Sequence, residues 1–75
     1  DQVEPMTTGT ITVGRKQLTT QTHEDASSGT ALTWVYRGLD LVATVETGGT
    51  AALVFGQPEA HGIDRAALKR ALGIV

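Results

Sequence analysis

Hydrophobic and polar residues alternate along most of this chain, which is the pattern of β-strands with one side buried. In "GTITVGRKQLTTQT" (9–22), Ile11 and Val13 share one side of a predicted strand. Gly14 breaks the alternation, so we predict a turn at 14–16. The strand that follows, 17–22, is rich in threonine and glutamine. Its polarity indicates a strand at a sheet edge.

The stretch "LTWVYRGLDLVATVETGGTAALVFG" (32–56) predicts three further strands and holds the chain's only Trp, Tyr and Phe. Leu32, Trp34 and Tyr36 share one side of the first strand. In the second strand, positions 39, 41, 43 and 45 are apolar and share one side. Gly48-Gly49 is a two-residue hairpin signal, and 50–56 is the partner strand. We expect Trp34 to lie in the core, because this chain has few other large residues. The alternation alone does not decide which sheet face a helix covers.

The hydrophobic spacing becomes helical near the end of the chain, in "IDRAALKRALGI" (63–74). Asp64 is placed to cap a helix N-terminus, with Ile63 and Leu68 as a hydrophobic staple around it. Gly73 is a natural C-terminal stop. The sequence therefore predicts an α+β fold: a small antiparallel meander sheet of four to five strands with one C-terminal helix packed on one face.

Length and composition favour a single small domain over residues 6–75, with residues 1–5 as an expression-vector remnant ahead of Met6. The 75 residues carry six basic and eight acidic side chains and no cysteine. Without Asp1 and Glu4 the charges balance, so nothing draws the chain toward anionic partners as a whole. The absence of cysteine excludes disulfides. No apolar run is long enough to cross a bilayer, so we expect no membrane partner and a cytoplasmic protein.

Catalytic motifs are absent from the sequence: there is no nucleophile elbow, phosphate-binding loop or paired-histidine zinc motif. His23 stands beside Glu24 and Asp25, a combination that suits a metal ion or general base. No third ligand has suitable spacing, and an exposed loop is the better explanation of the three residues. We therefore expect no enzyme, no cofactor and no metal.

The leading hypothesis is a non-enzymatic protein-interaction module, such as a small bacterial or phage accessory or inhibitor protein. It would bind another protein or a second copy of itself through an open sheet face or edge. The predicted partner-binding residues belong to the polar strand and to the side opposite Trp34: Gln17, Thr19, Gln21, Thr33, Val35, Arg37 and Val42.

The alternative is a small nucleic-acid-binding module. Its cations lie in the first turn and on the predicted helix: Arg15, Lys16, Arg65, Lys69 and Arg70. Trp34 or Tyr36 would stack on bases beside them. Such binding weakens steeply with salt.

Residues 29–73 resemble the RAMA-type domain, a small β-rich module associated with restriction and adenine-methylation proteins. The shared pattern is "GTALTWVYRG", then "LVATVETGG", a further strand, and a helix with paired alanines at Ala66 and Ala67. That family's helix usually starts with a Ser-Pro-Ser-like segment, where this chain has "HGID", and this chain adds an N-terminal hairpin. The resemblance implies a non-catalytic accessory role near DNA-modifying systems.

Overall fold

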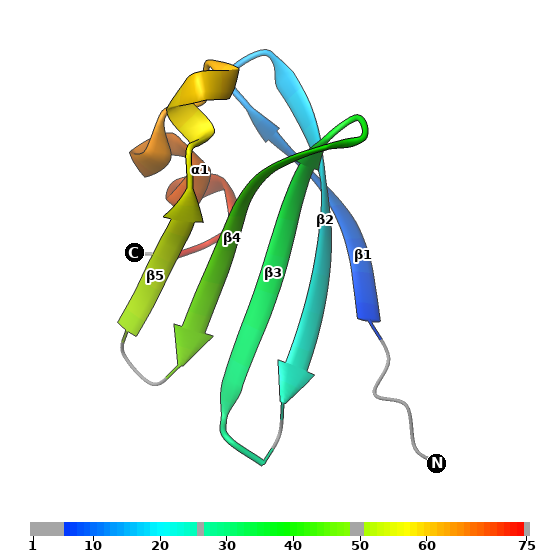
Figure 1. Cartoon of the computed structure of the whole chain (residues 1–75), viewed down its shortest axis with the longest axis vertical. Coiled ribbons are helices and arrows are strands. Elements are labelled where there is room, and N and C mark those ends of the chain that lie inside the picture. The colour runs from blue at the N-terminus through cyan, green and yellow to red at the C-terminus, as the bar shows by residue number, and fades with distance from the viewer. Residues whose placement is uncertain (1–5, 26, 49–50, 75) are drawn as a thin grey trace.

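The computed structural model describes residues 6–25, 27–48 and 51–74. The described chain forms one antiparallel sheet whose strands follow one another in chain order, β1-β2-β3-β4-β5. A single turn of 3-10 helix, η1, and a short α-helix, α1, follow the sheet (Figure 1). This arrangement confirms the predicted fold class. The bounds are β1 Met6–Val13, β2 Lys16–Asp25, β3 Thr30–Arg37, β4 Asp40–Gly48, β5 Ala51–Gly56, η1 Pro58–His61 and α1 Arg65–Ala71.

The polar strand β2 lies inside the sheet. It pairs with β1 along Met6↔His23 to Val13↔Lys16 and with β3 along Thr19↔Tyr36 to Asp25↔Thr30. The prediction that 17–22 forms an edge strand is therefore wrong, and the edges are β1 and β5. Thr and Gln are tolerated here because strand hydrogen bonds satisfy their backbone on both sides, while their side chains project from the sheet.

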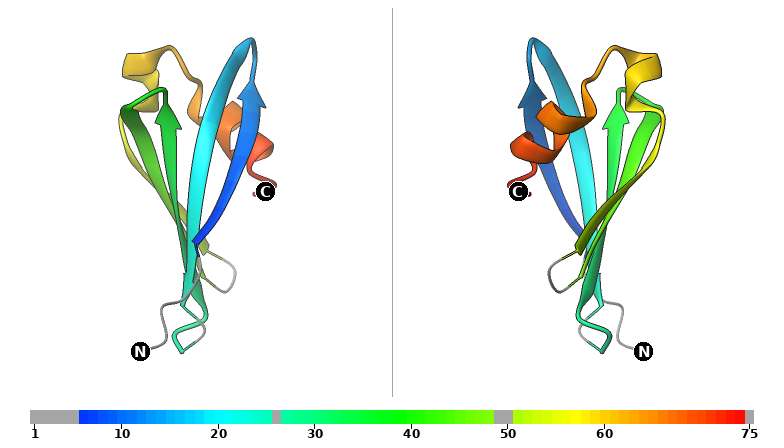
Figure 2. Two further views of the ribbon diagram at one scale, coloured as in Figure 1. Left: turned by 90° about the vertical axis from the view of Figure 1, so that its right-hand side faces the viewer. Right: turned by 90° about the vertical axis from the view of Figure 1, so that its left-hand side faces the viewer.

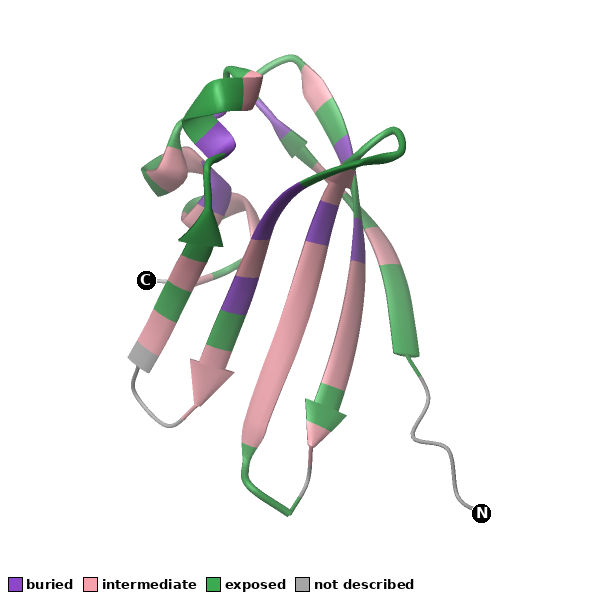
Figure 3. Ribbon diagram, in the orientation of Figure 1, coloured by how far each residue is buried: buried purple, intermediate pink, exposed green. Residues whose placement is uncertain are grey.

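The helices cover only one face of the sheet. Figure 2 shows η1 and α1 against the same side and near the end that carries the β1–β2 turn. The buried segments gather toward that end, as the purple bands in Figure 3 show. We call this side the covered face. Its core combines sheet residues with Ile63 and Leu68 from the helical segment: Val13, Leu18, Val35, Val42, Ala43, Val45, Ile63 and Leu68.

Trp34 lies on the opposite side of the sheet, which we call the open face. Val35, its neighbour in β3, is 0% exposed and belongs to the core, whereas Trp34 is only partly buried. The expectation that Leu32, Trp34 and Tyr36 form the core side is therefore wrong. Strand alternation forces the choice, because adjacent residues must face opposite sides.

A β-bulge in β4 separates residues that the sequence placed on one side. The register of β3 and β4 shifts between Val35↔Ala43 and Tyr36↔Leu41, so Val42 is an additional residue in β4. Val42 and Ala43 are consequently both buried, at 2% and 1% exposure. Leu41 instead shares the open face with Tyr36. A bulge places two residues opposite one, which breaks the period of two on which the prediction depended.

The helix begins and ends as predicted. The Asp64 carboxylate accepts a hydrogen bond from Ala67 N at 3.0 Å, and Leu68 is completely buried. At the other end, Gly73 adopts a positive φ of 79°. Gly73 N donates to Arg70 O and Ile74 N donates to Lys69 O, which is the pairing of a Schellman motif.

Two predicted features lie outside the described residues. The proposed remnant at 1–5 is one of them. The other is the hairpin connection predicted at Gly48-Gly49: Gly48 is the last residue of β4, and residues 49 and 50 lie outside the described residues. The flanking residues Gly48 and Ala51 are in register, as a two-residue connection requires.

Candidate interaction surface

The open face collects every aromatic residue of the chain. Trp34 of the central strand pairs with Gln21 of β2 and Thr44 of β4, and Thr44 pairs with Phe55 of β5. Paired residues project to the same side of a sheet, so these side chains form one row. The neighbouring rows add further apolar side chains. By register, the larger apolar residues of the open face are Met6, Leu32, Trp34, Tyr36, Leu41, Leu53 and Phe55.

Several of these side chains are half exposed. Leu41, Leu53 and Phe55 are 49%, 53% and 50% exposed. Their exposure is unlike that of Val35 or Leu18, which the helices seal from water. Single exposed apolar residues are normal on a protein, but a contiguous group of them marks an interaction site. The open face is therefore the candidate functional surface.

The charge of the open face is low and weakly acidic. In the described strands, its register positions include Glu46 and Asp25 as carboxylates, together with His23, and no lysine or arginine. Its other polar groups are hydroxyls and amides from threonine and glutamine. Such a face suits an uncharged apolar partner, because it has no cation to pair with phosphates and its two carboxylates lie at one end, away from the Tyr36–Leu41 pair.

Two shallow hollows border the Tyr36–Leu41 pair. The first has a volume of about 280 Å³ and is lined by Thr19, Gln21, Tyr36, Gly38 and Leu39. The second, of about 300 Å³, is reached on the β5 side and includes Leu41 and Phe55 in its lining. Leu39, at the tip of the β3–β4 turn, is 99% exposed beside the first hollow. Side chains of a partner that enter such hollows are the usual anchors of an interface.

The structure divides the predicted partner-binding residues between the two faces. Gln17, Thr19 and Gln21 lie on the open face, as their alternation in β2 and the pairing of Gln21 with Trp34 require. Val35 and Val42 do not: both are buried in the core, because the helices cover their side. Their assignment to an open face is wrong.

Thr33 and Arg37 also belong to the covered side. The Thr33 hydroxyl shares a 3.0 Å hydrogen bond with the Thr22 hydroxyl on the neighbouring strand. Arg37 Nη1 donates to the carbonyl of His61 in η1 at 3.4 Å. Their placement on an open face is wrong for the same reason as that of Val35.

The Arg65 side chain makes its hydrogen bonds to other groups of the same chain. Its guanidinium donates to Val54 O at 3.0 Å, to Gly56 O at 3.1 Å, and to both carboxylate oxygens of Glu59 at 3.2 Å. The hydrogen bonds and charge of Arg65 lower the pKa of Glu59, and Glu59 raises the pKa of Arg65. Arg65 thus joins α1 to η1 and to the end of β5.

The remaining predicted cations lie apart from the aromatic residues. Arg15 is exposed in the β1–β2 turn, and Lys16 follows it at the start of β2, paired with Val13 of the covered side. Lys69 is partly buried in α1 and Arg70 is exposed. The α1 helix lies on the covered face, so the structure does not bring its cations together with Trp34 or Tyr36.

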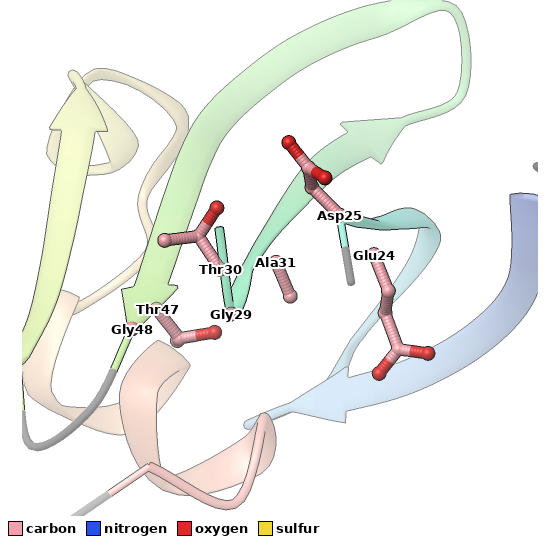
Figure 4. A pocket seen from close by; sticks show the side chains of 7 residues that line it. All are labelled: Glu24, Asp25, Gly29, Thr30, Ala31, Thr47 and Gly48. Atoms are coloured by element: carbon pink, nitrogen blue, oxygen red, sulfur yellow. The ribbon is translucent and has the colours of Figure 1, made fainter. Parts of the chain in front are cut away.

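The His23, Glu24 and Asp25 triplet does not converge. Strand alternation sends Glu24 to the side opposite His23, and Figure 4 shows the carboxylates of Glu24 and Asp25 pointing in different directions at a shallow hollow of about 480 Å³. Asp25 accepts hydrogen bonds from Ser27 Oγ at 2.7 Å and Ser27 N at 3.1 Å. Hydrogen bonds from the Ser27 and Ser28 hydroxyls lower the pKa of Asp25. Within the described ranges, no three His, Asp or Glu side chains form a group that suits a metal ion.

Sequence reasoning missed Leu41, Leu53 and Phe55 as surface residues. A usable signal existed for the last two. A two-residue connection after Gly48 pairs Gly48 with Ala51, and counting back from that pair places Phe55 opposite Thr44. For Leu41 no such count works, because the bulge intervenes.

Comparison of the chain with protein-family models, with curated proteins and with solved structures finds no match. The resemblance to RAMA-type domains therefore stays a prediction. In the part of the chain that the structure describes, no helix has both the length and the apolar composition needed to span a membrane.

Proposed function

We propose that this protein is a non-enzymatic interaction module that binds another protein through the open face of its sheet. The observation that carries the proposal is the grouping of Trp34, Tyr36 and Phe55 with half-exposed leucines on one uncovered side. Aromatic side chains supply much of the binding energy at protein interfaces, since they bury a large area with few rotatable bonds.

The partner is expected to present an uncharged, apolar surface of matching size. The molecule measures 38 and 26 Å along its two longer axes, so its broad side is large enough for the roughly 800 Å² per partner that a standard interface buries. The acidic groups of the face lie at Glu46 and Asp25, away from the Tyr36–Leu41 pair at the other end of the sheet. Threonine and glutamine around the aromatics offer the hydrogen bonds of a polar rim.

The described residues do not favour nucleic-acid binding, because their aromatic side chains and their cations lie apart. A stacking platform needs cations beside its aromatics to meet the phosphates. Here the strand positions around Trp34 carry hydroxyls and amides, and Arg65 is hydrogen-bonded to Glu59 and to two carbonyls. We expect no salt-sensitive binding of a single-stranded oligonucleotide at low ionic strength.

The test begins with a photo-crosslinking residue at position 53 on the open face and, as control, at position 66 on the exposed side of α1. A protein crosslinked in a nuclease-treated extract only from position 53 is then purified and titrated. We expect Phe55→Lys to weaken its affinity at least tenfold, because a charge replaces an aromatic contact. Ala66→Lys adds the same charge elsewhere and is expected to leave the affinity unchanged.

The proposal is abandoned if Phe55→Lys binds the purified partner as tightly as the unmodified protein, or if Ala66→Lys weakens the affinity as much as Phe55→Lys does. It is also abandoned if crosslinks form from both positions to the same proteins, since that pattern indicates non-specific adhesion. Circular dichroism of each variant verifies that the sheet is intact.

A further inference from the structure

The two edges of the sheet are treated differently. At β5, Arg65 donates to the carbonyls of Val54 and Gly56, which are the carbonyls that face away from β4. An edge whose outward acceptors are already hydrogen-bonded to a cationic side chain cannot readily add a strand there. The β5 edge is therefore blocked at its C-terminal half.

Within the described residues, no side chain donates to the outward carbonyls of β1 as Arg65 does at β5, although α1 packs against β1 from the covered face. The sequence of β1, "MTTGTITV", contains no charge and no proline. It pairs with β2 in an unbroken register over all eight residues, so no bulge twists it away. Native proteins usually blunt an edge strand with lysine, proline or a bulge, and β1 uses none of these within its described residues.

The outward hydrogen-bonding groups of β1 follow from its register. Val13 and Lys16 flank the two-residue turn and form a hydrogen-bonded pair, so alternate residues from Thr12 back turn their N–H and C=O away from β2. These residues are Met6, Thr8, Thr10 and Thr12, all exposed. The same alternation applies to β5, starting from the Gly48↔Ala51 pair. It turns the carbonyls of Val54 and Gly56 outward, and Arg65 donates hydrogen bonds to both.

We propose that β1 pairs antiparallel with β1 of a second copy of this chain, joining the two sheets into one continuous sheet. A two-fold axis perpendicular to the sheet makes the strand its own partner, and closed two-fold pairs are the commonest protein assemblies. An uncharged strand meets its own copy without like-charge repulsion. The axis also keeps both open faces on the same side, so the dimer presents two sets of aromatics on one face, separated by the β1 and β2 strands of the two copies.

The occupant that competes with a second copy is an extended segment of another protein. The second copy is favoured because β1 carries no charge that would select a charged peptide, and because the copy presents a strand of the same eight residues. Pairing over eight residues at about 3.4 Å each spans about 27 Å, well beyond a chance contact.

The test compares Thr10→Pro with Thr10→Val. Proline removes the outward N–H, and edge strands tolerate proline at such positions. Valine keeps the backbone donor and the β-branched shape. We expect sedimentation equilibrium at roughly 10–500 μM to give a dimer for the unmodified protein and for Thr10→Val. Thr10→Pro is expected to be a folded monomer.

Hydrogen exchange supplies a second readout. The amides of Thr8, Thr10 and Thr12 are expected to become protected as the protein concentration rises, and the amide of Ile11, which faces β2, is expected to be protected throughout. A monomer at all concentrations overturns the proposal. So does a dimer that survives Thr10→Pro but is lost in Phe55→Lys, since that result assigns the contact between copies to the open face. If β1 pairs only with an added extended peptide and not with a second copy, the proposal is also overturned, because the edge then binds a different protein.

Discussion

Val35 and Trp34 are neighbours in β3 with opposite surroundings. Val35 is completely buried against the helical segment, while Trp34 projects among glutamine and threonine on the open face. Apart from Leu18, the buried hydrophobic strand residues of the covered side are valines and one alanine, which leave a flat surface that the alanines of a short helix can approach closely. Size alone therefore does not determine which side of a sheet becomes the core.

A pair of lysine substitutions tests this assignment. We expect Val35→Lys to unfold the protein, because burying an unpaired ammonium costs several kcal/mol, a large share of a small domain's stability. Trp34→Lys is expected to remain folded, with a loss of about 1–2 kcal/mol from reduced apolar contact. Urea unfolding followed by far-ultraviolet circular dichroism measures both. The opposite order of stability would show that the helices cover the Trp34 side.

Residue-level prediction from the sequence succeeded where a local rule decided the outcome. Asp64 as helix cap and Gly73 as helix stop depend on neighbours within a few residues, and both were correct. The side on which Trp34 lies depends on where α1 returns to the sheet, which no local pattern specifies. The prediction that Val42 lies on the open face was wrong for a related reason. Its burial follows from a bulge that the alternation does not reveal.

At the scale of elements, η1 and α1 act as one unit held by Arg65. The guanidinium links Glu59 of η1 with the carbonyls at the end of β5, and Ile63 and Leu68 bury the segment in the core. The sequence predicted the helix but not this bridge, because Glu59, Arg65 and the last residues of β5 meet only after the chain has turned at Gly62.

The Glu59–Arg65 pair predicts a pH dependence of stability. The pKa of Glu59 is lowered in the folded protein by hydrogen bonds from Arg65. A lowered folded pKa gives stability that is complete above the ordinary glutamate pKa of about 4.3 and is lost as pH falls through the folded value. We expect Glu59→Gln to flatten the fall in melting temperature below that pH. Equal slopes for both proteins in thermal scans from acidic to neutral pH would contradict the role of the pair.

In the whole molecule, the sheet is larger than the area that η1 and α1 cover. The helices protect one end of one face, so an edge and an entire second face are left to solvent or to partners. The sequence predicted binding to another protein or to a second copy through an open face or edge, but it placed the edge at 17–22 and the open face on the side of Val35, because both assignments required the strand order and the covered side. Strand order placed β2 inside, and the covered side removed Val35 and Val42 from consideration.

If β1 pairs with its copy, folding and association are linked, and thermal stability depends on concentration. Mass action then favours the folded dimer by about 0.7 kcal/mol per chain for each tenfold rise in concentration, which raises the melting temperature of a domain this size by roughly 3–5 °C. We expect this rise for the unmodified protein and for Thr10→Val, and a constant melting temperature for Thr10→Pro. Because Phe55 lies on β5, at the far edge from β1, Phe55→Lys is expected to keep the full dependence. Differential scanning calorimetry over a hundredfold concentration range measures the slope, and a flat line for the unmodified protein would mean that β1 remains an unpaired edge.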